Sequence, residues 1–322
     1  MGEGKFIVGL EIGGTKMASA LVDPSSKVVG LKKRATPHFS SRAIVGAAEE
    51  VIDELLDENE VQPDELMGIG LGVAGMIDFR DGVVVFSPNL PLRNVPFRDL
   101  IRDYYHVPAF LDNDANVAAL AEKYYGYGRD VSNFVCLTLG TGIGAGIIIN
   151  NNIYRGATGS AGELGHTVID LDGPPCTCGS NGCFESLASG QAIARRVHEE
   201  LRRNKGRALL ELAQGKEENI NGELLTQAAK EGDGFSKDIL SEIGRIVGIG
   251  LTNIVNTFNP EMIIISGGIS EAGELLLEPA RRVVTEQALI PNSQVVKIVT
   301  TALGDRVGVM GAAALALHEL SS

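Results

Sequence analysis

Apolar residues follow two periodicities along the chain. Short apolar runs that end at glycine or polar turns predict buried strands, as at residues 6–10, 67–73, 134–139 and 262–266. Apolar positions three and four residues apart predict helices at 43–58, 115–125, 235–258, 275–287 and 308–320. Further strands are predicted at 18–22, 83–86, 109–112 and 146–149, with a short helix at 97–104. Because strands alternate with helices, the predicted fold class is α/β.

Glycine-rich turns recur between apolar strands. They are Gly13-Gly14-Thr15 and Gly140-Thr141-Gly142, with a further pair, Gly267-Gly268, after the strand 262–266. The repeated hairpin suggests two related domains. A Walker loop or a dinucleotide fingerprint would lead into a helix, whereas strands are predicted after the first two turns. Backbone amides in such turns can converge on an anion, so the pattern favours phosphate binding over tight turning alone.

The composition and net charge of the chain limit the binding partners that are expected for it. The chain has 322 residues with 41 acidic and 28 basic side chains, a net charge of −13, and this length suggests two domains. Neither nucleic acid nor an anionic membrane surface is expected as a partner, because both require clustered Lys and Arg. The first ten residues lack the basic and apolar segments of a secretion signal, and no apolar stretch resembles a membrane span. We therefore expect a reduced, cytoplasmic protein.

One cluster of sulfur and nitrogen ligands stands out. His166, Cys176, Cys178 and Cys183 lie within eighteen residues, and four such ligands are typical of a closed, tetrahedral structural zinc site. Disulfides would leave one of the three cysteines unpaired and are disfavoured in a reduced compartment. Inert buried cysteines are the alternative. The second ring nitrogen of His166 remains available to a substrate, and Cys136 lies in an apolar strand and is expected in the core.

Carboxylates and amides gather at predicted strand ends and loops. Asp112-Asn113-Asp114 follows a strand and opens a helix, so one of these residues is expected to cap that helix. A carboxylate at the end of a strand also has a fixed direction, which suits a general base. Glu163, His166 and Glu185 lie within the glycine-rich region 150–190 and suit recognition of sugar hydroxyls.

These motifs together resemble one family. They are LEIGGTK (10–16), VAGMID (73–78), SPNLP (87–91), LDNDANVAA (111–119), LTLGTGIGAGI (137–147), GELGH (162–166), CTCGSNGCFES (176–186) and ISGGIS (265–270). In this order they resemble the ROK family of sugar kinases and repressors, and most of all its bacterial-type glucokinases. The combination of GELGH with the cysteine motif is the most specific part of the resemblance.

The resemblance implies an actin-like, hexokinase-type ATPase fold, in which two ribonuclease H-like α/β domains close over a cleft. The expected domains are a small one at 1–114 with the C-terminal helix 305–322, and a large one at 115–304 with the zinc-binding loop 166–183. The implied reaction is ATP-dependent phosphorylation of glucose at its 6-hydroxyl, with Asp114 as general base and Mg²⁺ bound with ATP. A homodimer or tetramer is implied as well.

The resemblance also assigns binding residues. The sugar would contact Gly75, Asn89, Asn113, Asp114, Glu163, His166 and Glu185. ATP would contact Glu11, Gly13, Gly14, Thr15, Lys16, Gly140, Thr141, Gly142, Gly267 and Gly268. One position departs from the family pattern, because Glu11 stands where most members have Asp.

Three alternatives remain open at this stage. The sugar can be another hexose, such as fructose, mannose, N-acetylglucosamine or N-acetylmannosamine, and the phosphate donor can be ADP or polyphosphate. A sugar-responsive repressor is less expected, because the first hairpin begins at residue 6, which leaves no room for a helix-turn-helix, and the chain is acidic. A sugar-binding protein without activity is disfavoured by Asp114 and the two hairpin turns.

Overall fold

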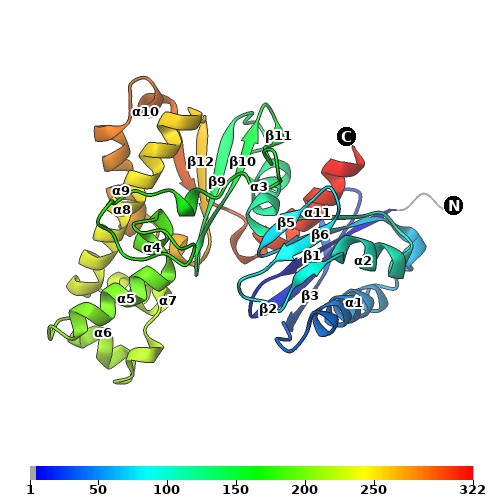
Figure 1. Cartoon of the computed structure of the whole chain (residues 1–322), viewed down its shortest axis with the longest axis horizontal. Helices are drawn as coiled ribbons and strands as arrows, with labels where there is room; N and C mark the ends of the chain where they lie inside the picture. Colours follow the sequence, from blue (N-terminus) through cyan, green and yellow to red (C-terminus); the bar gives the residue numbers. More distant parts are fainter. Residues whose placement is uncertain (1–4, 322) are drawn as a thin grey trace. The chain divides into compact units, whose positions relative to one another are not determined.

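The computed structural model describes residues 5–321, which form two compact units (Figure 1). Unit 1 comprises residues 1–130, 146–162 and 303–322, and unit 2 comprises residues 131–145 and 163–302. Residues 1–4 and 322, which belong to the predicted N-terminal domain, lie outside the described part. Unit 1 extends past the predicted domain boundary at residue 114, because the helix that follows packs on the C-terminal helix.

Unit 1 is built on a five-stranded sheet with the order β3-β2-β1-β4-β8. The strands are β1 (Phe6–Ile12), β2 (Lys16–Val22), β3 (Val28–Ala35), β4 (Leu66–Val73) and β8 (Ala109–Asn113). The first three strands pair antiparallel, while β4 runs parallel to both β1 and β8. Ile12 pairs with Val73, which in turn pairs with Asn113, so the carboxyl ends of β1, β4 and β8 are level at one edge. This edge carries the candidate catalytic residues.

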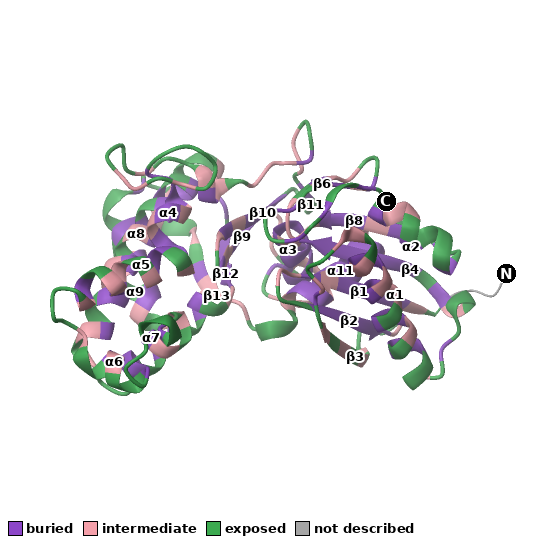
Figure 2. Ribbon diagram, turned by 60° about the horizontal axis from the view of Figure 1, so that its bottom comes forward, coloured by how far each residue is buried: buried purple, intermediate pink, exposed green. Residues whose placement is uncertain are grey.

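Helices cover both faces of this sheet. They are α1 (Ser41–Glu58), α2 (Phe97–Tyr105), α3 (Asp114–Tyr125) and α11 (Val307–Leu320), and a small sheet consists of β5 (Met76–Asp78), β6 (Val83–Phe86) and β7 (Arg93–Val95). Side chains alternate along a strand, so Leu10 joins the core formed with Ile44 of α1, while Ile7 packs with Ala313 of α11. Figure 2 shows the resulting burial of β1 and β4.

Helix α11 lies very close to β4, and this contact leads to a stability prediction. A Cβ atom at position 70 would lie 1.8 Å from the carbonyl oxygen of Ala312, a backbone atom that cannot move alone. We expect Gly70→Ala to lower the free energy of unfolding by about 3 kcal/mol, at the upper end of overpacking effects. Denaturant unfolding of the purified variant measures this.

Gly46→Ala is the matched control for this substitution. Gly46 lies within α1, and a Cβ atom there has no neighbour within 4 Å. Alanine in the helix is expected to raise the stability by about 0.5–1 kcal/mol. Equal effects of the two substitutions would contradict the close approach of α11 to β4.

Unit 2 contains the strands β9, β12 and β13 of a second five-stranded sheet, which has the order β11-β10-β9-β12-β13. Its strands are β9 (Phe134–Leu139), β10 (Ile143–Ile149), β11 (Asn152–Ile153), β12 (Met262–Ser266) and β13 (Lys297–Thr300). The helices of unit 2 are α4 (Phe184–Ala188), α5 (Gly190–Leu201), α6 (Arg207–Leu212), α7 (Gly222–Lys230), α8 (Gly234–Phe258), α9 (Glu274–Gln287) and α10 (Asn292–Val295). Short 3₁₀ turns in unit 2 are η2 (Leu164–His166), η3 (Glu217–Asn219) and η4 (Gly268–Ala272), and those in unit 1 are η1 (Pro63–Glu65) and η5 (Gly304–Arg306).

The predicted α/β class is confirmed, and each predicted long helix is present within a few residues of its expected bounds. The sequence analysis assigned no element to β3, where every second residue is exposed, or to the helices between residues 190 and 230. Within residues 5–321, no helix combines the length and the apolar character needed to cross a bilayer.

Candidate functional site

The junction of β8 and α3 orders the candidate base. Asn113 is the N-cap of α3, and its Oδ1 accepts a hydrogen bond of 2.8 Å from the Ala115 amide. Its Nδ2 donates to the Gly75 carbonyl oxygen at 2.8 Å, which ties the end of β8 to the segment after β4. Asp114 is the first residue of α3, is half-buried, and accepts from the Ala115 amide at 3.1 Å. The predicted cap of this helix is therefore Asn113.

Two more predicted sugar-site residues lie in unit 1. Gly75 has a φ of 143°, and a Cβ there would lie 2.5 Å from the Phe86 carbonyl oxygen, so only glycine fits without strain. Asn89 borders the first glycine turn, because a Cβ at Gly14 would lie 3.2 Å from the Asn89 Cβ. The structure thus brings Asn89 to the first hairpin turn and Gly75 to Asn113.

Glu11 carries an unusual charge environment. Burial and, after it, the nearby charge of Asp114 raise the pKa of Glu11 to about 7, although Lys16 and Lys33 oppose the shift. The carboxylate lies against the first turn of α11, where a Cβ at Gly308 would be 2.1 Å from the Glu11 Cδ. The absence of a side chain at Gly308 leaves room for a glutamate, with its extra methylene, in the place where aspartate was expected.

The second hairpin turn is held by a residue assigned to the sugar. Ile143 donates its amide to Glu185 Oε2 at 2.8 Å, and the Gly140 amide donates to the Gly142 carbonyl at 3.0 Å. The turn after β12 lies beside it, because a Cβ at Gly267 would be 2.3 Å from the Leu139 carbonyl oxygen. Unit 2 therefore brings the glycine turns at 140–142 and 267–268 together with Glu185.

Three thiols and an imidazole converge in the loop before α4. The ligand atoms of His166, Cys176, Cys178 and Cys183 all lie within 4.8 Å of one another. His166 Nδ1 is 3.6 Å from the Cys176 sulfur, and the Cys178 and Cys183 sulfurs are 3.6 Å apart. The other ring nitrogen of His166, Nε2, lies 4.0 Å from Glu163 Oε2. The four predicted ligands are thus brought together, and these residues can hold a metal ion.

Comparison with known sequences gives the family of the chain. The sequence model of the ROK family matches residues 7–319. The chain belongs to the ROK family. The resemblance found in the motifs is therefore confirmed over almost the whole chain.

ROK relatives of two kinds are similar to this chain. A glucokinase of Streptomyces coelicolor is 35% identical over 312 residues, which cover 96% of each protein. A xylose repressor of Caldicellulosiruptor bescii is 37% identical over 273 residues, which cover 85% of this chain and 68% of the repressor. The ROK glucokinase of Streptomyces griseus, solved with glucose and AMPPNP, has a TM-score of 0.85 at 34% identity and covers 97% of this chain and 99% of that one. The predicted two-domain ROK hexokinase fold is thereby confirmed.

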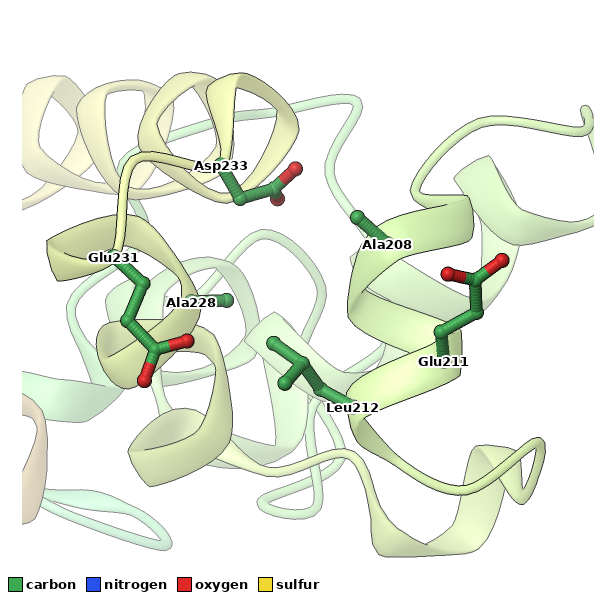
Figure 3. A pocket seen from close by; sticks show the side chains of 6 residues that line it. All are labelled: Ala208, Glu211, Leu212, Ala228, Glu231 and Asp233. Carbon is green, nitrogen blue, oxygen red and sulfur yellow. The ribbon is translucent and has the colours of Figure 1, made fainter.

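One cavity of this ROK protein contains none of the predicted site residues. It has a volume of about 430 Å³ and lies in unit 2 between α6 and α7 (Figure 3). Glu211, Glu231 and Asp233 line it, and Asp233 caps α8 by accepting from the Ser236 amide at 2.8 Å. The cavity is acidic and unsuited to a phosphate group, so it does not add to the candidate site.

Sequence reasoning missed two residues that shape the site of this ROK protein. Gly308 makes room for Glu11, and Arg155 forms an ion pair with Asp112, the residue two positions before Asp114. Neither residue stands out in the sequence, because the partner of each lies far away along the chain. Arg155 falls in the glycine-rich region, where only binding loops were expected.

Proposed function

We propose that this chain is a ROK sugar kinase that transfers the γ-phosphoryl group of ATP to the 6-hydroxyl of glucose. The observation that carries the proposal is the position of Asp114 at the level edge of β1, β4 and β8, with its charge felt by Glu11. A base needs a fixed direction, and the capped start of α3 supplies it. The similarity to glucokinases supports glucose as the sugar.

In this proposal Asp114 takes the proton of the sugar hydroxyl. Asn89, Asn113, Glu163, His166 and Glu185 bind the other hydroxyls, and Gly75 gives them space. The glycine turns at 13–16, 140–142 and 267–268 bind the phosphates and the adenosine side of ATP through backbone amides. Magnesium bound with ATP would neutralise phosphate charge, and the Glu11 carboxylate would lie toward the magnesium ion.

Turnover against a panel of sugars tests the proposal. Glucose, mannose, fructose, N-acetylglucosamine and N-acetylmannosamine are each offered with magnesium and ATP, and ADP and polyphosphate are tried as alternative donors. We expect glucose to give the highest kcat/KM. Another sugar in first place would keep the kinase and change the substrate, whereas no turnover with any sugar and donor would refute the kinase.

The xylose repressor relative favours a second candidate, a sugar-responsive regulator without catalysis. The two candidates differ in a measurable way, because a regulator binds sugar but does not consume ATP. Isothermal titration with glucose and xylose in the absence of nucleotide, beside the turnover panel, separates them. Binding of xylose without phosphorylation of any sugar would favour the regulator.

We further propose that His166, Cys176, Cys178 and Cys183 hold a structural zinc ion. Ligands of a tetrahedral zinc ion lie about 3.5–3.8 Å apart, and the two 3.6 Å separations in the cluster fit this value. The ligand set is closed, so zinc would fix the loop between η2 and α4. Because Nδ1 of His166 faces the thiols, Nε2 remains on the side of Glu163, which suits a sugar hydroxyl.

Cys178→Ser is expected to abolish stoichiometric zinc binding, because one of the three thiolates in a set of four ligands is lost, and the site needs all four. The protein should also melt at a lower temperature, and its affinity for sugar should fall as the loop loses its shape. Zinc per chain is measured by atomic absorption. Cys136→Ala is the matched control, because Cys136 is buried in β9 outside the cluster and should leave one zinc per chain. Unchanged zinc content in Cys178→Ser would refute the ligand assignment.

A further inference from the structure

Arg155 bridges two carboxylates inside unit 1. Its Nε donates to Asp112 Oδ2 at 2.7 Å, and its Nη2 donates to Glu319 Oε1 of α11 at 2.6 Å. The Arg155 side chain is 13% exposed and the Asp112 side chain 1% exposed. Charge-assisted bonds with this little water are strong, and a guanidinium group holds two partners in a fixed plane.

The other oxygen of Asp112 holds the segment that carries the proposed base. Asp112 Oδ1 accepts from the Asn113 amide at 2.7 Å and from Asn116 Nδ2 at 2.8 Å. These two donors stand on either side of Asp114, at the start of α3. Any change in the direction of the Asp112 carboxylate therefore changes the direction of the Asp114 backbone.

Arg155 also connects this segment to the loop that leads to Glu163. Its guanidinium lies 4.7 Å from the ring centre of Phe79, and a Cβ at Gly159 would be 3.1 Å from that ring. The Arg155 carbonyl oxygen accepts from the Ala161 amide at 3.1 Å, which closes the turn 155–161. One side chain thus ties together the β8–α3 junction, α11 and this turn.

An anion site is the competing interpretation of these contacts. Arg155 lines a cavity of about 360 Å³ in unit 1 together with Arg80, Arg98 and Arg102. Carboxylates neutralise most of this charge, because Arg98 pairs with Asp99, and Arg102 pairs with both Asp99 and Asp103. Arg80 lies over the ring of Phe79, 5.7 Å from its centre. Arg155 itself is paired twice, so the cavity offers little net positive charge to an anion. Arg155 therefore acts on the buried carboxylate of Asp112 and not on a bound anion.

We propose that Arg155 is a positioning residue, which fixes Asp112 and through it the direction of Asp114. The expected effect of Arg155 on kcat rests on the proposed function, whereas its effect on the order of residues 112–116 does not. Arg155 does not itself touch the sugar in this scheme. Its loss should therefore lower kcat while KM for ATP stays nearly constant.

The first test does not depend on activity. Amide hydrogen exchange of the peptide covering residues 112–116 is compared in the wild-type protein, in Arg155→Gln and in Arg196→Gln. Arg196 is the matched control, because it pairs with Glu200 and Glu242 in unit 2. We expect exchange to be at least tenfold faster in Arg155→Gln only. Unchanged exchange in Arg155→Gln would overturn the proposal, whether or not the chain proves to be a kinase.

The second test uses turnover of the sugar that the wild-type protein prefers. A misplaced base costs on the order of 10² in rate, so kcat should fall about 10²-fold in Arg155→Gln and about tenfold in Arg155→Lys, which keeps the charge but loses the planar fork. The double variant Arg155→Gln/Asp112→Asn should be no slower than the slower single variant, because both act through one contact. The inference would be refuted if the two substitutions lowered kcat multiplicatively in the double variant, or if Arg155→Gln had the kcat of an active wild type. Neither result would contradict the proposed kinase activity.

Discussion

Asp114→Asn is expected to remain folded and to bind sugar while kcat falls by about 10² or more, the usual loss for a missing general base. The substitution keeps the shape of the side chain and an oxygen that can accept from the Ala115 amide, as Asp114 does at 3.1 Å. It removes the negative charge of the side chain and with it the capacity to take a proton. The measurements are kcat with magnesium and ATP, the sugar dissociation constant by titration, and the melting temperature.

The control for this experiment is Asp64→Asn. Asp64 is an exposed carboxylate in the first turn of η1, in the same unit, and has no ion pair within the described residues. Its substitution should change neither kcat nor sugar affinity. Turnover of Asp114→Asn within threefold of the wild type would show that Asp114 is not the base.

The elements that sequence reasoning located share a strong local signal. The helix 235–258 was predicted from its apolar repeat and is present as α8. Gly244 lets α9 approach this helix closely, because a Cβ at Gly244 would lie 2.5 Å from the Leu276 carbonyl oxygen of α9. The strand β3 was missed, because an edge strand with every second residue exposed carries too few apolar positions to be recognised.

In the candidate site as well, residues that are close in sequence were predicted, whereas contacts between residues far apart in sequence were missed. The cysteine and histidine ligands are close in sequence, and their spacing alone predicted a cluster that the structure brings within 4.8 Å. Arg155 and Asp112 are 43 positions apart, and Glu11 and Gly308 lie near opposite ends of the chain. Neither pair follows a local pattern, because each arises from the register of β1, β4 and β8 and from the packing of α11 on the sheet. Such contacts require the fold.

Glu11→Gln is expected to stabilise the protein at high pH and to impair the kinase. In the folded chain the pKa of Glu11 is raised to about 7, first by burial and then by the charge of Asp114, against 4.5 in the unfolded chain. The folded state therefore holds the proton more tightly than the unfolded state. Stability from this group is complete below pH 4.5 and is lost as the pH rises through 7, by about 3 kcal/mol in total.

The stability difference between Glu11→Gln and the wild type should depend on pH. At pH 8 Glu11→Gln should be more stable than the wild type by up to about 3 kcal/mol, and near pH 4.5 the difference should largely vanish. The measurement is denaturant unfolding of both proteins at the two pH values, without magnesium or nucleotide, which would bind the folded state. If the stability difference between the two proteins were the same at both pH values, the pKa of Glu11 would not be raised in the folded protein.

The same charge that destabilises the folded chain is the one that the proposed function needs. Glu11 lies against the first turn of α11 and near the charge of Asp114, so its carboxylate is held there at a cost in stability. Glu11→Gln should therefore lower turnover with magnesium and ATP at least tenfold at pH 8, although it stabilises the fold. Glu11→Asp, which keeps the charge and restores the residue most common in the family motif, should retain turnover. Full activity in Glu11→Gln would show that the Glu11 carboxylate has no role in turnover with magnesium and ATP.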